Sequence, residues 1–297
     1  MYAHEIGLNL ARAGWKISLK RRFYRGLWFV ISPALTRLGP ISGVVLTCTR
    51  NDGGGAQWLA RISVIAFANR FGFRYQHSEI YELMPVGSNE IRKTWNNLIT
   101  GTFEGQLLRP VRVRVISLKQ LILLSIRGCL CRRQVLVDIG HLHVYTDWFP
   151  SSIENARLDK NLICTNPAGI GEVAATGLSF AAVHVRRGLE WEWEFGANRV
   201  TSNSEVLRRI TLLVESRGPM TGTVYSGLPN PELEALLPEG FELNSTANEF
   251  EVIHRMINAD FVILAKSSMS YIAGVFARGE VIYEPFWHPA LSNWTKI

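Results

Sequence analysis

The stretch Phe180-Ala181-Ala182-Val183-His184-Val185-Arg186-Arg187-Gly188 decides the fold of the C-terminal half. Its apolar part has the length and composition of a buried β-strand. The strand ends by delivering one histidine and two arginines to a glycine turn. The planar guanidinium group of arginine matches phosphate oxygens, so the pair indicates a diphosphate pocket. An arginine pair on the surface beside a core histidine is the alternative interpretation.

Apolar strands alternate with helical patterns from this stretch to the C-terminus. We expect strands at 180–185, 223–225, 241–243, 261–265 and 281–283. We expect helices between them: one with Ser204 as N-cap and Gly218-Pro219 as its stop, and others at 231–237, around 250–257 and at 269–277. Strands separated by crossover helices form right-handed β-α-β units, so the pattern predicts a doubly wound parallel sheet.

Polar residues follow the ends of three of these strands. They are His184, Arg186 and Arg187 after the first strand, Ser226 and Gly227 after the second, and Lys266, Ser267, Ser268 and Ser270 after the fourth. Open α/β sheets bind ligands outside the carboxyl ends of their strands, and hydroxyls at a helix start suit phosphate oxygens. Three strand ends are therefore expected to converge on one anionic ligand, for which a nucleotide is the natural candidate. A serine pair that only caps the helix is the alternative.

The pattern His184-x-Arg186-Arg187 resembles the His-x-Arg-Arg-x-Asp motif of the fucosyltransferase superfamily. That superfamily includes α-1,2-, α-1,6- and protein O-fucosyltransferases, which transfer fucose from GDP-fucose. Residues 256–271 are similar to the family's second block, with Ala-Asp, an apolar strand and a serine-rich turn before a helix. Upstream, residues 53–57 are similar to the glycine-rich, glutamine-containing first loop of the family. The resemblance covers mainly residues 180–288.

The resemblance implies a GT-B-like α/β fold, with two Rossmann-like domains and a cleft between them. We expect a basic, aromatic N-terminal extension over residues 1–40 and an N-terminal α/β domain on the acceptor side over 41–165. A C-terminal Rossmann-like domain over 166–297 would bind the nucleotide sugar. The resemblance also implies inversion at the anomeric centre without a cofactor or a metal, with a nucleotide sugar and a glycan as partners. The sequence agrees in having no Asp-x-Asp of the metal-dependent kind.

Site residues follow from the resemblance, position by position. Arg186 would be catalytic, because it would hold the β-phosphate and stabilise the charge of departing GDP. Arg187 would either bind the donor or hold the site residues in place without contacting the donor. His184 and Asp260 would contact the base or ribose. The full donor-binding set is His184, Arg186, Arg187, Ser226, Asp260, Ser267 and Ser268, and the acceptor-side set is Gly54, Gly55, Gln57 and Trp191.

The segment that follows the arginine pair alternates acidic and indole side chains at 190–194. Indole faces stack on sugar rings, and a carboxylate there could accept a proton from an acceptor hydroxyl. We therefore expect Trp191 at the acceptor site and Glu190 as the catalytic base. The alternative is a strand or loop that packs its indoles on the core.

Three positions depart from the family pattern. Leu189 stands at the acidic position of the motif, Ala56 replaces the asparagine of the first loop, and Gly227 replaces an acidic residue after the second strand. These departures leave two alternatives to a GDP-fucose transferase. One is a glycosyltransferase with another nucleotide-sugar donor, and the other is a non-catalytic relative that binds nucleotide sugars or glycans.

Composition and charge limit the class of protein and the kind of partner that this chain can have. The chain has 297 residues with 47% hydrophobic content, enough for two ordinary α/β domains and too apolar for a disordered protein. The four cysteines form no disulfide framework and no common zinc spacing, so we expect free thiols. The formal net charge of +7 suits an anionic donor or a membrane surface. Without a long basic run, nucleic acid is not expected as a partner.

The N-terminal half is less regular. Residues 12–30 mix basic and aromatic side chains, as in a helix that lies on an anionic membrane; packing on the N-terminal domain is the alternative. No signal peptide or membrane span is expected, which suggests a cytoplasmic or peripheral membrane protein. We expect strands at 44–48, 111–115 and 135–140, and a helix at 118–126. Another helix follows the glycine loop, with the apolar face Trp58, Leu59, Ile62, Ile65 and Ala66.

Two local patterns in this half have competing interpretations. Three glycines at 53–55 allow a ligand to approach the backbone closely, and a tight structural turn explains them equally well. His141, His143 and Asp147 follow the strand at 135–140 and could be read as metal ligands. Because a His-x-His without a firm third ligand is more often structural, we expect no metal.

Overall fold

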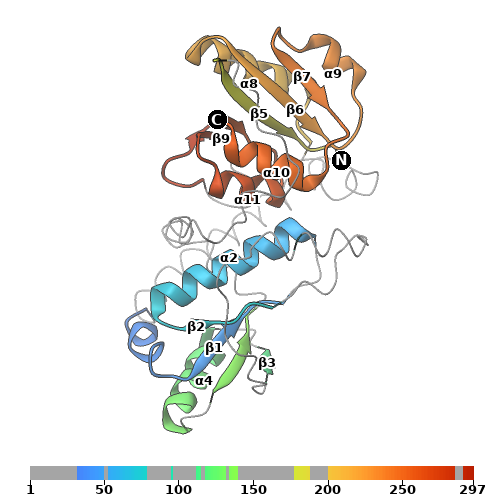
Figure 1. Cartoon of the computed structure of the whole chain (residues 1–297). Coiled ribbons are helices and arrows are strands. Elements are labelled where there is room, and N and C mark those ends of the chain that lie inside the picture. Colours follow the sequence, from blue (N-terminus) through green and yellow to red (C-terminus); the bar gives the residue numbers. More distant parts are fainter. Residues whose placement is uncertain are drawn as a thin grey trace, which may run out of the picture.

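The computed structural model describes residues 32–49, 53–78, 95, 112–114, 118–131, 134–139, 177–187, 200–284 and 290–297. They form two α/β units, each built on a parallel sheet (Figure 1). The predicted fold class, α/β with two units, is confirmed. The predictions for residues 12–30, for Glu190 and Trp191, and for the group around His141 lie outside the described residues.

Among the described residues, the N-terminal unit contains four strands, a helical segment at 32–38 and the helices α2 and α4. The labelled elements are β1 (Val44–Thr47), α2 (Gly54–Phe71), β2 (Arg74–Tyr75), β3 (Arg112–Arg114), α4 (Leu118–Cys131) and β4 (Val135–Asp138). The strand order is β2-β1-β4-β3, and every pair is parallel. The predicted strands and both predicted helices of this unit are therefore confirmed, with α4 running further than expected. The order differs from that of a Rossmann sheet, because β4 lies beside β1 and β3 forms the edge.

In the described part of the C-terminal unit, six strands form one sheet. The elements are β5 (Ser179–Val185), α8 (Asn203–Arg217), β6 (Met220–Ser226), α9 (Pro231–Leu236), β7 (Phe241–Asn244), α10 (Glu249–Asn258), β8 (Phe261–Ile263), α11 (Ser268–Phe276), β9 (Glu280–Tyr283) and β10 (Thr295–Lys296). The order β10-β9-β8-β5-β6-β7 is parallel throughout. Read from β7, this is the Rossmann order, and β5 and β8 flank the point where the order reverses.

Local capping explains where these helices begin. Asn230 caps α9, since its side chain accepts a hydrogen bond from Leu233 N at 2.9 Å. The cap of α8 is Ser202 and not the predicted Ser204. Ser202 Oγ accepts from Glu205 N at 3.2 Å, whereas Ser204 already lies in the first turn. The short edge strand β10 was not predicted, because two residues carry no detectable period.

The alternation of side chains along β5 fixes which face each residue occupies. Ala181, Val183 and Val185 pack in one cluster with apolar residues of α8. Ala182 packs in another cluster with α10 and α11, on the opposite face. Since side chains alternate along a strand, His184 lies on the same face as Ala182 and is directed to α11.

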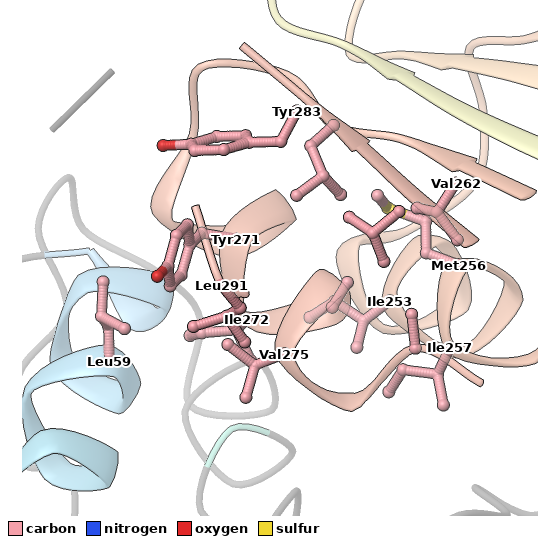
Figure 2. Close-up of a cluster of buried hydrophobic side chains, with 14 of the residues drawn as sticks. Leu59, Ile253, Met256, Ile257, Val262, Tyr271, Ile272, Val275, Tyr283 and Leu291 are labelled. Carbon is pink, nitrogen blue, oxygen red and sulfur yellow. The ribbon is translucent and has the colours of Figure 1, made fainter. Parts of the chain in front are cut away.

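Helix α2 lies between the two units and is buried on both sides (Figure 1). Its predicted apolar face, Trp58, Leu59, Ile62, Ile65 and Ala66, joins the core of α10 and α11. Figure 2 shows Leu59 of α2 in this cluster, with Tyr271, Ile272 and Val275 of α11. A second face of α2 packs on the N-terminal sheet. Its residues are Ala60, Val64, Phe67, Ala68 and Phe71. A helix that is apolar on both faces is an interior helix. None of the described helices is both long and apolar enough to cross a membrane.

The start of α2 makes close contacts that only glycine permits. A Cβ on Gly55 would lie 2.7 Å from Met269 N, at the start of α11, and a Cβ on Gly54 would lie 2.3 Å from the indole of Trp95. These distances are well inside ordinary van der Waals contact. The glycine loop therefore has a structural role in joining the two units.

This packing predicts that Gly55→Ala destabilises the protein. The added methyl group would meet backbone atoms of α11, so we expect the free energy of unfolding to fall by about 1–3 kcal/mol. Chemical denaturation measures this change. The matched control is Gly227→Ala, because a Cβ there meets no atom within 4 Å. Equal stability of the two variants would contradict the packing of α2 on α11.

Candidate functional site

The carboxyl ends of β5 and β8 bring Arg186 and Ser267 together. Arg186 Nη1 donates a hydrogen bond to Ser267 Oγ at 3.4 Å. Ser267 is the N-cap residue of α11, but its side chain forms no capping hydrogen bond. The interpretation of Ser267 as only a cap is therefore wrong, because its hydroxyl is directed to the arginine.

His184 is held by a buried serine of α11. Its Nδ1 lies 2.5 Å from Ser270 Oγ, which also accepts a hydrogen bond from Ala265 N at 3.2 Å. The imidazole ring is thereby fixed to the turn after β8. Burial, and secondarily the positive charge of Arg186, lower the pKa of His184 from 6.5 to about 4. The ring is neutral at pH 7 and carries a single N–H group, which is on Nε2 in the tautomer whose Nδ1 accepts from Ser270 Oγ.

Two helix starts meet beside these side chains. Gly55 in the first turn of α2 contacts Met269 in the first turn of α11. Within the described residues, neither Gly53 before α2 nor Ser267 before α11 caps the first N–H groups with a side chain. Free N–H groups and the positive ends of helix dipoles attract anions. Together with the cation Arg186, they make this part of the boundary between the units favourable for a phosphate group.

Ser268 and Ser226 lie at the same edge of the sheet and differ in what their hydroxyls do. Ser268 opens α11, is half-buried, and its hydroxyl has no hydrogen-bond partner among the described residues. Ser226 ends β6, and its Oγ donates to Leu228 O at 2.7 Å within its own turn. Ser268 is thus available to a ligand, whereas Ser226 shapes the turn after β6.

Arg187 is anchored away from Arg186. Its Nη2 donates to Asn203 Oδ1 at 2.5 Å, and its Nη1 donates to the carbonyl of Thr201. Partial burial lowers the pKa of the Arg187 guanidinium. Arg187 therefore ties the end of β5 to the start of α8, the ordering role that was one of its two expected roles.

The side chain of Lys266 forms an ion pair with Glu284. Its Nζ lies 2.7 Å from Glu284 Oε1, and the other oxygen of Glu284 lies 2.6 Å from Arg209 Nη2. Arg209 in turn pairs with Glu205 at 2.8 Å. This network ties the ends of β8 and β9 to α8 and leaves Arg186 as the cation beside Ser267.

The structure does not bring Asp260 to this site. Asp260 precedes β8, and its Oδ2 accepts from Phe180 N at 2.8 Å, at the amino ends of the strands. His184 and Arg186 lie toward the carboxyl end of β5, about 13 Å and about 20 Å along the strand from Phe180. The role given to Asp260 at the donor's base is thus corrected: its carboxylate closes the opposite edge of the sheet.

The structure also corrects the acceptor-side set. Gln57 is fully buried, and its side-chain oxygen accepts from Arg61 Nη1 at 3.3 Å. Arg61, itself fully buried, also donates to the carbonyls of Gln57 and Ser78. Gln57 and the two packed glycines Gly54 and Gly55 are therefore buried in the core, where an acceptor does not reach them.

Two residues that the sequence did not single out, Trp95 and Glu249, connect the start of α2 with the start of α10. Trp95 Nε1 donates to Glu249 Oε2 at 3.1 Å, and its carbonyl accepts from Trp58 Nε1 at 2.8 Å. The Trp95 ring also packs edge-on against Phe250, with 5.1 Å between centroids. Trp95 thus connects α2 with the start of α10. No periodic pattern surrounds Trp95, so only its being a large aromatic residue could have marked it.

Among the described residues, no group of three or more His, Cys, Asp or Glu side chains is arranged to hold a metal ion. The predicted alternative around His141 lies outside these residues, so the expectation of a metal-free reaction stays a prediction. What the described residues offer is a cation, hydroxyls, a neutral imidazole and free N–H groups. This set suits a phosphorylated ligand.

Comparisons with known proteins gave no match to a protein-family model or to a curated protein. Among solved structures, the chain is similar to POFUT1 in complex with GDP at 12% identity and a TM-score of 0.46, covering 81% of this chain and 97% of that chain. It is similar to the E. coli heptosyltransferase WaaC with ADP-2-deoxy-2-fluoro heptose at 14% identity and a TM-score of 0.39, covering 86% and 92%. NodZ α-1,6-fucosyltransferase co-crystallised with GDP gave 13% identity and a TM-score of 0.38, covering 78% and 92%. Scores below 0.5 do not identify a function, so we draw none from them.

The environment of His184 predicts a pH dependence of stability. Its pKa is about 4 in the folded state and 6.5 in the ordinary state, so protonation favours unfolding. The stabilisation is present above pH 6.5 and is lost as the pH falls toward about 4. We expect the free energy of unfolding of His184→Asn to fall less steeply than that of the wild type across this window, as measured by denaturation at several pH values. Parallel curves for the two proteins would contradict the assigned environment.

Proposed function

We propose that this protein is an inverting glycosyltransferase that transfers fucose from GDP-fucose to a glycan or glycoconjugate. One observation supports this proposal most: His184, Arg186 and Ser267 converge where the strand order of a Rossmann-type sheet reverses. Nucleotides bind at this point of such sheets. The resemblance of residues 180–288 to fucosyltransferases supplies the donor class.

The donor's diphosphate would lie between the end of β5 and the start of α11. Arg186 would pair with the β-phosphate, while Ser267, Ser268 and the first N–H groups of α11 donate to its oxygens. The neutral imidazole of His184, with Nδ1 accepting from Ser270 Oγ, would donate its single N–H group, at Nε2, to the nucleotide. Arg187 would hold the loop after β5 in place through the start of α8.

In the proposed reaction, the acceptor oxygen attacks the anomeric carbon of fucose from the side opposite the diphosphate. The acceptor proton passes to a base, the bond between the anomeric carbon and the phosphate oxygen breaks, and its electron pair leaves with GDP. Arg186 and the helix start stabilise the charge that develops on the leaving group. Glu190 as the base and Trp191 as a sugar platform stay predictions.

A different nucleotide sugar is a second candidate donor. The reason is the position of Asp260, which was expected to recognise the base and lies at the opposite edge of the sheet. Diphosphate binding at Arg186 is common to all such donors, so the proposed site fits them equally. We propose binding without a metal, and we keep membrane contact through residues 12–30 as a prediction.

Calorimetric titration of GDP, GDP-fucose, UDP and ADP in the presence of EDTA tests the proposal. We expect GDP and GDP-fucose to bind to the wild type, and Arg186→Ala to weaken binding by at least about tenfold, because a charge-assisted bond to phosphate is lost. The matched control is Arg217→Ala. Arg217 pairs with Glu280 at the amino end of β9, far from the site, and its loss should leave binding unchanged.

The outcomes separate the candidates. Preferential binding of UDP or ADP would replace GDP-fucose as the donor, and binding of no nucleotide would contradict the proposed function. Release of GDP from GDP-fucose in the absence of acceptor would distinguish a transferase from a binding protein. Equal loss in Arg186→Ala and Arg217→Ala would show a general destabilisation and contradict the placement of the diphosphate.

A further inference from the structure

Helix α4 has a row of apolar side chains on its outer face. Leu123, Ile126 and Leu130 are 56%, 42% and 79% exposed. Residues that are three and four positions apart lie one above the other on the same side of a helix, so these three form one continuous apolar stripe. A single exposed leucine is common on a soluble protein, whereas a contiguous apolar stripe indicates an interaction surface.

The opposite face of α4 is buried in the N-terminal unit. Leu121, Ser125 and Gly128 lie on that face, and Leu121 is part of the core beneath the sheet. A Cβ on Gly128 would lie 2.0 Å from the carbonyl oxygen of Ser42, so the helix lies directly on the backbone before β1. This packing fixes the rotation of α4 and keeps the apolar stripe outward. Figure 1 shows α4 at the end of the N-terminal unit that is remote from the C-terminal unit.

The charge around the stripe is positive. Arg127 is exposed on the same face, four residues after Leu123 and three before Leu130. Residues 105–137 contain seven Lys or Arg and no Asp or Glu. In the described part of the N-terminal unit the only acidic residue is Asp138, which is 2% exposed. A partner of this face is therefore expected to be anionic.

The two halves of the chain differ in the sign of their charge. Residues 1–139 contain 20 Lys or Arg and 7 Asp or Glu, whereas residues 140–297 contain 12 Lys or Arg and 18 Asp or Glu. An anionic surface would attract the N-terminal unit and repel the C-terminal unit. The charge distribution thus favours the same orientation as the apolar stripe, with α4 toward the partner.

Aliphatic side chains beside cations suit the surface of an anionic lipid bilayer. The stripe would enter the boundary of the acyl chains, while basic side chains pair with the phosphate head groups. A second copy of the chain fits less well, because a twofold axis would bring the same positive face against itself. Since α4 has 14 residues, it is too short to cross the hydrocarbon core and would lie along the surface.

We propose that the stripe of Leu123, Ile126 and Leu130, with Arg127 beside it, docks the N-terminal unit on an anionic membrane surface. The docked helix lies parallel to the bilayer, and the C-terminal unit is directed away from it. This inference goes beyond the proposed function and does not depend on the identity of the donor. It is also separate from the predicted membrane contact through residues 12–30, which belongs to a different part of the chain.

Vesicle sedimentation with the full chain tests the inference. The probes are vesicles of phosphatidylcholine with about one quarter phosphatidylserine, and vesicles of phosphatidylcholine alone. We expect the wild type to bind the anionic vesicles at least about tenfold more tightly, and high salt to release it, because salt screens the surface charges. Leu123→Ser combined with Leu130→Ser should weaken binding to the anionic vesicles by at least about tenfold, since two apolar side chains no longer enter the bilayer. Arg127→Gln should weaken it by about fivefold.

Leu236→Ser is the matched control. Leu236 of α9 is 56% exposed, as Leu123 is, but belongs to the C-terminal unit, so this variant should bind vesicles like the wild type. Chemical denaturation verifies that the variants are folded, because replacing exposed leucines changes stability little.

Several results would overturn the inference. They are failure of the wild type to bind the anionic vesicles, equal binding to both kinds of vesicle, and equal binding of the wild type and the double variant. A wild-type dimer in solution that the double variant does not form would assign the stripe to a second copy and would also overturn it. Titration of GDP in the absence of lipid decides the proposed function separately.

Discussion

The parallel pairing of β5 with β8 is the constraint on which the rest of the site depends. Ala181 is paired with Phe261 and Val183 with Ile263, so the two strands end side by side. This register places the loop that carries Arg186 next to the loop that carries Ser267, although the two residues are far apart in the sequence. Since side chains alternate along β5, the same register turns His184 to Ser270 of α11. One pairing thus assembles the cation, the hydroxyl and the imidazole.

The two units are joined by a shared hydrophobic core. Helix α2 buries one face against its own sheet and the other against α10 and α11. The glycines at its start let α2 approach α11 and Trp95 to distances that any side chain would prevent. The glycine-rich loop resembles a ligand-binding loop in sequence. In the structure its glycines position α2 against the start of α11, where the donor is proposed to bind.

Electrostatics divides the charged residues at the carboxyl edge into two groups. Lys266, Arg209, Glu205 and Glu284 neutralise one another in a network that ties β8 and β9 to α8. Arg187 is used to hold the start of α8. Arg186 lies instead beside Ser267 at the start of α11. The proposed site therefore depends on one arginine of the tandem pair, and the other supports it.

The sequence by itself determined the alternation of strands and helices in the C-terminal unit, because the apolar period of each element is local. It also determined that His184, Arg186 and Ser267 follow strand ends, and the carboxyl-end rule for parallel sheets brought them together correctly. Only the tertiary structure decided that Asp260 lies at the opposite edge, that Gln57 is buried against Arg61, and that Trp95 donates to Glu249 at the start of α10. These outcomes depend on which end of a strand a residue occupies, which helix face is covered by the other unit, and which side chain fills the space beside a glycine. Such facts arise from contacts between distant segments, and no local pattern in the sequence encodes them.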